Sequence, residues 1–339
     1  MKQNKTIKCY ISGEILTPEN SNDEHIIQDF LGGKLKSKAL MTSDWNDEFG
    51  KTIDKSLSKS IVLDEILGIP SGSGKAKKKF KGKDNENKRY DLKPGKFQGT
   101  EEPTKPKIIK DKDGNELLCV AGDKSRNTQF IESEKKKNPS LTEAEIAKRV
   151  RIEERNEKRE VYHENYLGPI SGINPIRAIA KIAANYYVFM TKDIEWVQPL
   201  VPLIRDSFID RNRVTNFYDF SLKDLAVSKH EVSHILYLEG NPKEGLLFCY
   251  LELFNTYCFM VLINEYYTGE CIRHYYKNDL ITGKVTQSPP KFEIPYLKIR
   301  RLRWEEKGLD KEFENRCTRA MKLYGGELTT KPNQKNNSI

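Results

Sequence analysis

The chain has 339 residues, of which 37% are hydrophobic and 32% are charged. That length allows two domains of ordinary size, and no window approaches the ~18 consecutive apolar residues of a membrane span, so we expect a soluble protein without a membrane partner. The net charge of +9 favours a polyanionic partner, with nucleic acid the first candidate.

The first residues are basic but lack the apolar run of ~7–15 residues of a secretory signal, so we expect a cytoplasmic protein. Six cysteines are scattered along the chain without a CxxC pair. This spacing argues against a disulfide framework and against a zinc ribbon. We expect reduced thiols, most of them buried as small apolar groups.

The N-terminal part is predicted to contain a short strand at 5–11 and a helix at about 45–58. Ser43 and Asp44 are good helix N-cap types, and the acidic residues that follow suit the first turn of a helix. Gly50 lowers the helical propensity by roughly 1 kcal/mol relative to Ala.

The middle of the chain begins with a basic stretch, 75–96, which is typical of a loop or linker; a phosphate-tracking arm is the other interpretation. Asp113-Gly114 between two apolar runs predicts a β-hairpin at about 106–121. A capping-box pattern at Ser140 predicts a long, exposed helix that extends to about Tyr162.

The C-terminal part is predicted to be an α+β domain. Apolar residues recur at helical spacing after Asn174-Pro175, which indicates a core helix, and two apolar runs between Val232 and Phe254 indicate buried antiparallel strands. The aromatic-rich stretch 255–267 is expected in the core. The whole chain is therefore predicted as an α+β protein with four parts: a module at 1–70, a basic linker, hairpin and charged helix at 71–165, an α+β domain at 166–325, and a flexible tail at 326–339.

The chemistry-bearing residues gather in the N-terminal part. They are Asp23-Glu24-His25-Ile26-Ile27, then Leu31-Gly32-Gly33, then the run from Ser43 to Lys51 that contains Asn46. In this order they resemble the HNH endonuclease family over roughly residues 5–60. The resemblance implies a ββα-metal module, with His25 as general base and a divalent metal held by Glu24 and Asn46. Many bacterial members act in restriction or phage defence.

Hydrolysis of a phosphodiester gives a reason for these residue types. Imidazole can take a proton from water near neutral pH, and carboxylate and amide oxygens suit Mg²⁺, with Mn²⁺ as a substitute. Because successive strand residues point to opposite faces, Glu24 and His25 can serve one site only if the strand bends or ends there.

The chain departs from the family at two places. A four-cysteine structural zinc is not expected, because Ser12 follows Cys9 at the first pair and Thr42 and Trp45 stand at the second. Packing of Trp45 is expected to substitute for the zinc. Ala39 stands where the family carries an Asn that orients the base, so the orientation of His25 must come from elsewhere and activity could be weakened.

Lys34, Lys36 and Lys38 alternate after the glycines, so an extended segment would present all three on one face beside the site. With Lys51 they are candidates for binding nucleic acid, DNA in preference to RNA; a solvated strand face is the other interpretation. A homo-oligomer or a protein partner in a defence complex is also possible.

Two other functions fit parts of the sequence. A nucleic-acid-binding or assembly subunit that kept the fold and lost catalysis would account for the missing zinc ligands and Ala39. The run His230-Glu231-Val232-Ser233-His234 matches the HExxH pattern of zinc peptidases. That pattern requires a helix, and the residues that follow favour a strand instead.

Overall fold

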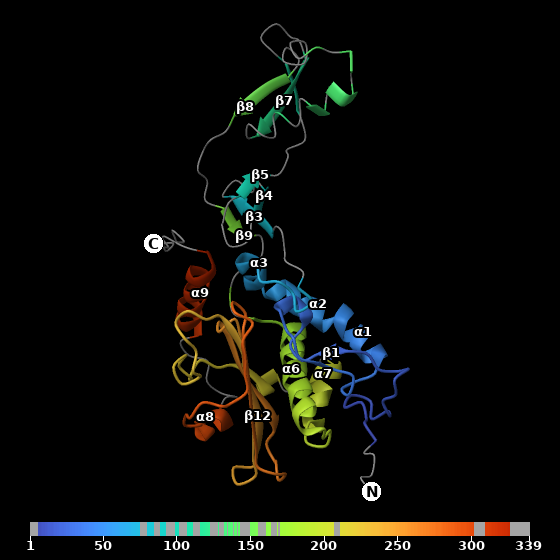
Figure 1. Cartoon of the computed structure of the whole chain (residues 1–339), viewed down its shortest axis with the longest axis vertical. Helices are drawn as coiled ribbons and strands as arrows, with labels where there is room; N and C mark the ends of the chain where they lie inside the picture. The colour runs from blue at the N-terminus through green and yellow to red at the C-terminus, as the bar shows by residue number, and fades with distance from the viewer. Residues whose placement is uncertain are drawn as a thin grey trace, which may run out of the picture. The chain divides into compact units, whose positions relative to one another are not determined.

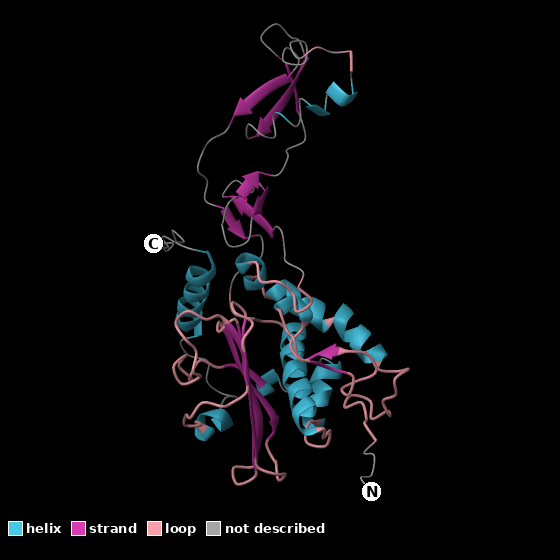
Figure 2. Ribbon diagram, viewed as in Figure 1, coloured by secondary structure: helices cyan, strands magenta, loops and turns pink. Residues whose placement is uncertain are grey.

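The computed structural model describes most of the N-terminal and C-terminal segments and shorter pieces of the middle segment. The described residues are 6–74, 80–84, 89–92, 99–101, 107–110, 116–122, 128, 132–133, 135–137, 139–140, 142, 150–154, 161–163, 168, 170–206, 211–301 and 309–325. Both helices and antiparallel sheets are present, so the α+β class is confirmed (Figures 1 and 2).

The chain divides into two compact units. One unit contains Met1–Lys78, Pro94–Lys96 and Asn165–Ile339, and the other contains Lys79–Lys93 and Phe97–Glu164. The segments 1–70 and 166–325, which the sequence analysis treats as separate domains, thus belong to one unit. The physical reason is a shared hydrophobic core, to which both segments contribute buried side chains.

The larger unit is built on a six-stranded antiparallel sheet with the strand order β10-β13-β12-β11-β14-β15. Its strands are β10 Val214–Asn216, β11 Ser233–Asn241, β12 Leu246–Leu253, β13 Tyr257–Asn264, β14 Ile272–Asp279 and β15 Val285–Thr286. β11 and β12 form the predicted buried hairpin, and β13 places the aromatic-rich stretch in the core. Both predictions are confirmed.

The central strands are buried on both faces, because two hydrophobic clusters cover the sheet. On β12, Cys249 and Leu251 belong to the larger cluster, whereas Phe248 and Tyr250 belong to the smaller cluster on the other face. Alternate residues therefore enter different cores, which explains why these strands have continuous apolar sequences.

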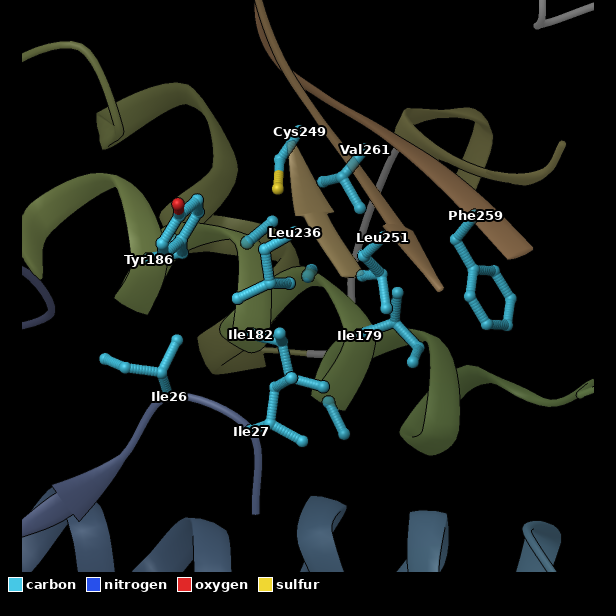
Figure 3. Packing of buried hydrophobic residues seen from close by; sticks show 14 of the residues in the cluster. Ile26, Ile27, Ile179, Ile182, Tyr186, Leu236, Cys249, Leu251, Phe259 and Val261 are labelled. Carbon is cyan, nitrogen blue, oxygen red and sulfur yellow. The ribbon is translucent and has the colours of Figure 1, made fainter. Parts of the chain in front are cut away.

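Helix α6, Ile173–Thr191, packs on one face of this sheet and confirms the predicted core helix. Figure 3 shows Ile179 and Ile182 of α6 close to Leu236 and Leu251 of the sheet, and Ile27 of the N-terminal segment in the same cluster. α6 thus lies between the sheet and the N-terminal segment (Figure 1).

The N-terminal segment contains two short strands and three helices. They are β1 Glu24–His25, β2 Lys36–Ser37, α1 Ser43–Lys51, α2 Ile53–Ser60 and α3 Leu63–Leu67. The single helix predicted at 45–58 is wrong, because the helix breaks at Thr52, whose φ and ψ are −112° and −85°. The Thr52 hydroxyl donates a 2.7 Å hydrogen bond to the Glu48 carbonyl, and such back-bonding by a β-branched residue bends helices.

The strand predicted at 5–11 is reduced to one isolated bridge between Lys8 and Ile15. The chain instead turns tightly, since the Gly13 amide donates to the Cys9 carbonyl at 2.8 Å and the Cys9 amide donates to the Glu14 carbonyl at 2.8 Å. Gly13 has a φ of 77°, which explains the need for glycine in this turn.

The smaller unit contains two sheets, with strand orders β5-β4-β3-β9 and β6-β7-β8. The strands are β3 Phe80–Asp84, β4 Arg89–Leu92, β5 Gly99–Glu101, β6 Lys107–Lys110, β7 Glu116–Gly122, β8 Val150–Glu154 and β9 Val161–His163. β6 and β7 pair as the predicted hairpin, with Lys110 opposite Glu116; the Asp113-Gly114 turn lies outside the described residues.

Two predictions for this unit are wrong. The basic stretch 75–96 contains β3 and β4 rather than only a linker, and the helix predicted at 140–162 contains the strands β8 and β9. β8 pairs with β7, and β9 pairs with β3. These partners are distant in sequence, so pairing across the chain overrides a local composition that favours a helix.

Further helices are η1 Asp29–Leu31, η2 Gln198–Leu200, α7 Val201–Asp206, η3 Arg211–Arg213, α8 Tyr296–Arg301 and α9 Leu309–Gly325. Within the described residues, no helix has the length and apolar content of a membrane span. The five cysteines whose side chains the structure describes are free thiols, and all of them except Cys271 are buried, as expected. The tail 326–339 lies outside the described residues.

Candidate functional site

Strand β1 consists only of Glu24 and His25 and pairs with β2, with Glu24 opposite Ser37 and His25 opposite Lys36. The chain bends directly after His25, so the strand end required by the sequence analysis is present. Glu24 is buried with 5% of its surface exposed, whereas the His25 side chain is 30% exposed.

Glycine residues hold the loop after β1 in place. Gly32 has a φ of 88°, and a Cβ atom added to Gly33 would lie 1.8 Å from the Ile27 carbonyl oxygen. Gly32 therefore allows a left-handed turn, and Gly33 allows a close approach of two backbone segments.

A cleft of about 470 Å³ lies in front of β1, between the loop after this strand and the helices α1 and α2. Glu24, His25 and Asn46 all lie on its wall, although Asn46 is more than 20 positions away in sequence. The complete lining is Asp23, Glu24, His25, Gln28, Asp29, Phe30, Asn46, Gly50, Asp54, Lys55 and Ser58. The three residues to which the sequence analysis gave a catalytic or metal-binding role thus share one cleft.

Behind the cleft, Lys181 of α6 bonds to two of its carboxylates. Its Nζ lies 2.8 Å from Oε1 of Glu24 and 2.6 Å from Oδ2 of Asp54, and its side chain is 0% exposed. The ring of Phe49 lies 5.7 Å from the same nitrogen. Burial by itself lowers the pKa of Lys181, but attraction and hydrogen bonds from Asp54 and Glu24 outweigh it, so the pKa lies above its ordinary value.

Asn185, one turn after Lys181, completes the support of Glu24. Its amide nitrogen donates to Oε1 of Glu24 at 3.0 Å and to the His25 carbonyl at 3.3 Å. Its amide oxygen accepts a 2.8 Å hydrogen bond from the Tyr10 hydroxyl. Burial, followed by the charge of Glu24, raises the pKa of Tyr10 well above the ordinary value, so this hydroxyl remains a donor.

The sequence analysis missed Lys181, Asn185 and Asp54. A signal was present: a lysine and an asparagine four positions apart interrupt the apolar residues that follow Arg177 in this helix. A buried lysine requires an anionic partner, so Lys181 predicts a carboxylate beside it. The sequence does not identify which Asp or Glu provides that carboxylate.

His25 is accompanied by Asp29, whose Oδ1 lies 3.7 Å from the imidazole Nε2. Asp29 itself is held by Ser73, whose amide donates to Oδ1 at 2.8 Å and whose hydroxyl donates to Oδ2 at 3.2 Å. Asp29 is thus the nearby group that can orient the imidazole. Ala39, the position at which the family carries an orienting Asn, is not among the residues that line the cleft.

The donor set of the cleft fits a hard divalent cation. The Asn46 amide nitrogen donates to Asn22 Oδ1 at 2.7 Å, which leaves the Asn46 amide oxygen as the atom available for a metal. Gln28 Oε1 is buried and has no hydrogen-bond partner within the described part of the chain. Lys181 brings one positive charge to the two carboxyl groups of Glu24 and Asp54.

Glu24 can contribute one oxygen to such a cation. Both of its hydrogen bonds, from Lys181 and Asn185, fall on Oε1, and none from the described residues falls on Oε2. The described residues contain no group of three or more His, Cys, Asp or Glu side chains arranged as a metal site. A cation here would therefore rely on Glu24, amide oxygens and water, as Mg²⁺ commonly does.

The four lysines proposed for nucleic-acid binding lie on the surface, outside the cleft wall. Lys34, Lys36 and Lys38 are exposed and alternate with less exposed residues, as expected for one face of an extended segment. Lys36 forms a 2.8 Å ion pair with Asp23, which lines the cleft. Lys51 is exposed at the end of α1.

The region around Cys9, Thr42 and Trp45 is held by packing and hydrogen bonds. The Ser12 amide donates to the Cys9 sulfur at 3.4 Å, and the Tyr10 amide donates to the Leu40 carbonyl at 3.1 Å. Trp45 packs on the core with its ring centroid 5.4 Å from that of Phe49.

The HExxH run does not form a helix. His230 is exposed in a turn, and His234 lies fully buried in β11. Nδ1 of His234 accepts a hydrogen bond from the Phe254 amide at 3.2 Å, and Nε2 lies 2.7 Å from the Leu31 carbonyl. Both ring nitrogens are therefore used by the backbone, and the strand expected here is confirmed.

Comparisons of the chain with protein-family models, with curated proteins and with solved structures found no match.

Proposed function

We propose that this protein is a metal-dependent endonuclease of the HNH type that hydrolyses phosphodiester bonds of nucleic acid, with DNA as the preferred substrate. The observation that carries the proposal is the convergence of Glu24, His25 and Asn46 on one cleft. By family analogy alone, its role is restriction or defence against foreign DNA.

In this proposal, His25 is the general base. Its imidazole is partly exposed at the cleft, where water can reach it. The Asp29 carboxylate faces Nε2 and favours the tautomer with hydrogen on this atom, which leaves Nδ1 to accept the proton of the attacking water. Asp29 thus takes over the orienting role that Ala39 cannot perform.

Glu24 and Asn46 are the residues that hold the divalent metal, Mg²⁺ or Mn²⁺. When bound, the metal polarises the phosphate and stabilises the leaving oxygen. Lys181 and Asn185 fix the Glu24 carboxylate through Oε1. Asn22 fixes the Asn46 amide. The chain's own contribution is therefore a ligand pair whose orientation is set before substrate arrives.

Exposed lysines supply the contacts to the phosphate backbone. Lys34, Lys36 and Lys38 project from the segment that pairs with β1, so a strand of nucleic acid bound along them passes beside the cleft. Such contacts position the substrate and carry no sequence information.

Cleavage of supercoiled plasmid and of a short duplex by the purified full chain in Mg²⁺ tests this function. We expect cleavage that EDTA abolishes and that His25→Ala slows at least 100-fold, the usual contribution of a general base. His230→Ala, which alters an exposed histidine outside the cleft, is the matched control and should cleave normally. Cleavage that persists in both EDTA and His25→Ala would refute the mechanism.

A nucleic-acid-binding subunit without catalysis is the second candidate. The contact of Lys181 with Glu24 favours it, because an ammonium group already occupies one oxygen of the proposed metal ligand. Its signature is salt-sensitive binding of DNA without cleavage in Mg²⁺, Mn²⁺ or other divalent metals.

A further inference from the structure

The 279–284 turn joins β14 to β15, which is an edge strand of the six-stranded sheet. Its first residue, Asp279, is buried with 8% of its surface exposed. The Asp279 carboxylate accepts hydrogen bonds from the Ile281 amide, at 3.0 Å, and from the Thr282 hydroxyl. Its backbone carbonyl accepts a 2.7 Å hydrogen bond from the Gly283 amide. These bonds fix the shape of the turn.

The turn lies beside the segment that carries the exposed lysines. Nζ of Lys34 donates to the Gly283 carbonyl at 3.5 Å. Leu280 packs against the other end of that segment, since a Cβ atom added to Gly32 would lie 3.4 Å from Leu280 Cδ2. An ammonium group has three N–H donors, so the bond to Gly283 leaves Lys34 able to bind a phosphate as well. Lys284, at the end of the turn, is also exposed.

The turn carries an exposed apolar side chain, although turns favour Gly, Pro, Asn, Asp and Ser. Ile281 is 45% exposed, and its backbone amide is held by Asp279. A single exposed isoleucine is common on protein surfaces, but this one stands on a fixed turn beside two exposed lysines. An apolar tip with cations on its flanks complements duplex DNA, in which a stack of bases lies between phosphates.

We propose that the 279–284 turn binds double-stranded DNA, with Ile281 as a wedge between base pairs and with Lys34 and Lys284 on the flanking phosphates. Architectural proteins insert Ile, Leu, Phe, Met or Pro between base steps from the minor groove, which partly unstacks the bases and kinks the duplex. This inference rests on the proposed function, because it takes DNA as the ligand, but it does not require cleavage.

The wedge gives the protein a sequence preference that phosphate contacts cannot provide. Pyrimidine–purine steps such as TA are flexible and unstack readily, whereas A-tracts are stiff. Less energy is therefore needed to insert Ile281 at a TA step, and binding there is tighter. The preference comes from the deformability of the DNA, without hydrogen bonds to base edges.

Binding of the purified full chain to short duplexes in Ca²⁺ tests the proposal. One duplex alternates T and A and carries 2-aminopurine, whose fluorescence rises on unstacking, in place of some adenines. The other duplex is an A-tract of the same length. We expect the wild type to raise the fluorescence of the alternating duplex. Ile281→Ser should abolish this rise and weaken binding to the alternating duplex about tenfold, the value of one buried isoleucine side chain, while binding to the A-tract is unchanged.

The control variants separate the wedge from a general effect on the surface. Ile281→Leu keeps an apolar side chain and should behave as the wild type does. Ile15→Ser removes an isoleucine that is 56% exposed in the segment before β1, and it should also leave binding unchanged. Because Ile281 is exposed, Ile281→Ser should unfold in urea at the same midpoint as the wild type.

The lysine contact has its own readout. Lys284→Gln should lower the slope of log K against log salt by about 0.9, the value of one phosphate contact. Lys298→Gln, at an exposed position on α8, should leave the slope unchanged.

Unchanged 2-aminopurine fluorescence in the wild-type complex would overturn the inference, and this measurement needs no variant. The same conclusion follows if Ile281→Ser binds and unstacks the alternating duplex as the wild type does, or if Lys284→Gln retains the full salt slope. In these cases DNA still binds, so the proposed function stands. A wild-type chain that binds neither duplex overturns the proposed function, and this inference with it.

Discussion

Nζ of Lys181 lies 2.8 Å from Oε1 of Glu24, although 157 positions separate the two residues in the chain. This ion pair connects α6, the central helix of the larger unit, to β1, the strand at the cleft. Since Asp54 on α2 binds the same ammonium group, three separate elements meet at one buried charge. The wall of the cleft is therefore connected to the core of the larger unit through this buried lysine.

Replacing Lys181 by Met should destabilise the protein by about 3–5 kcal/mol, because the buried carboxylate of Glu24 and the partly buried carboxylate of Asp54 lose the cation that they share. The free energy of unfolding from urea titration in EDTA measures this loss. Lys298→Met removes one member of an exposed ion pair and should cost no more than about 1 kcal/mol. Equal losses of unfolding free energy in the two variants would show that burial does not make the Lys181 ion pairs more important for stability.

The buried His234 predicts a loss of stability in mild acid. Burial lowers its pKa to about 4, whereas the unfolded chain has a pKa of about 6.5. Between these two pKa values, the unfolded state binds a proton at this histidine and the folded state does not. The free energy of unfolding is therefore highest above about pH 6.5 and decreases as the pH is lowered to about 4. The loss attributable to this residue is up to about 3 kcal/mol.

Urea unfolding at a series of pH values checks this prediction. In His234→Gln, the fall in stability between pH 6.5 and 4 should be smaller than in the wild type, although the variant is less stable throughout. His230→Gln, at an exposed position, should follow the wild-type curve. If all three curves fall in parallel, His234 is not the source.

Asp29→Asn should slow cleavage at least tenfold while leaving the fold intact. The change removes the negative charge beside His25 Nε2, but the amide oxygen can still accept the hydrogen bond from the Ser73 amide, and the new NH2 group can donate to the Ser73 hydroxyl. Asp224→Asn is the control, since Asp224 also accepts hydrogen bonds from one serine: its Oδ2 lies 3.1 Å from the Ser221 amide and 2.7 Å from the Ser221 hydroxyl. Initial cleavage rates at saturating Mg²⁺ measure the effect; equal rates for both variants would exclude Asp29 as the orienting group.

Replacing Lys34, Lys36 and Lys38 together by Gln should weaken DNA binding and make the affinity less dependent on salt concentration. Each lost phosphate contact lowers the slope of log K against log salt by about 0.9, so the slope should fall by about 2–3. Fluorescence anisotropy with a labelled duplex in Ca²⁺ gives the slope. Lys298→Gln should leave it unchanged, and an unchanged slope in the triple variant would show that these lysines do not contact phosphates.

Much of the larger unit follows from local sequence. The apolar period after Asn174-Pro175 indicated α6, and the apolar runs on both sides of the 242–245 turn indicated the hairpin of β11 and β12. Both elements have strong local signals: a helical repeat in one and β-branched or aromatic runs in the other. The prediction failed where sequence-distant partners decide the structure, as for β8, which pairs with β7 in a region whose composition favours a helix.

For the candidate site, the sequence by itself identified the side chains that we propose carry the chemistry: Glu24 and His25 as neighbours, and Asn46 on a following helix. Only the tertiary structure decided that they share one cleft with Asp54 and that Lys181 and Asn185 bind its carboxylates from behind. The physical reason is that a buried charge is stable only beside an opposite charge, and the local sequence does not indicate which distant segment provides that charge. That choice depends on how α6 packs between the sheet and the N-terminal helices.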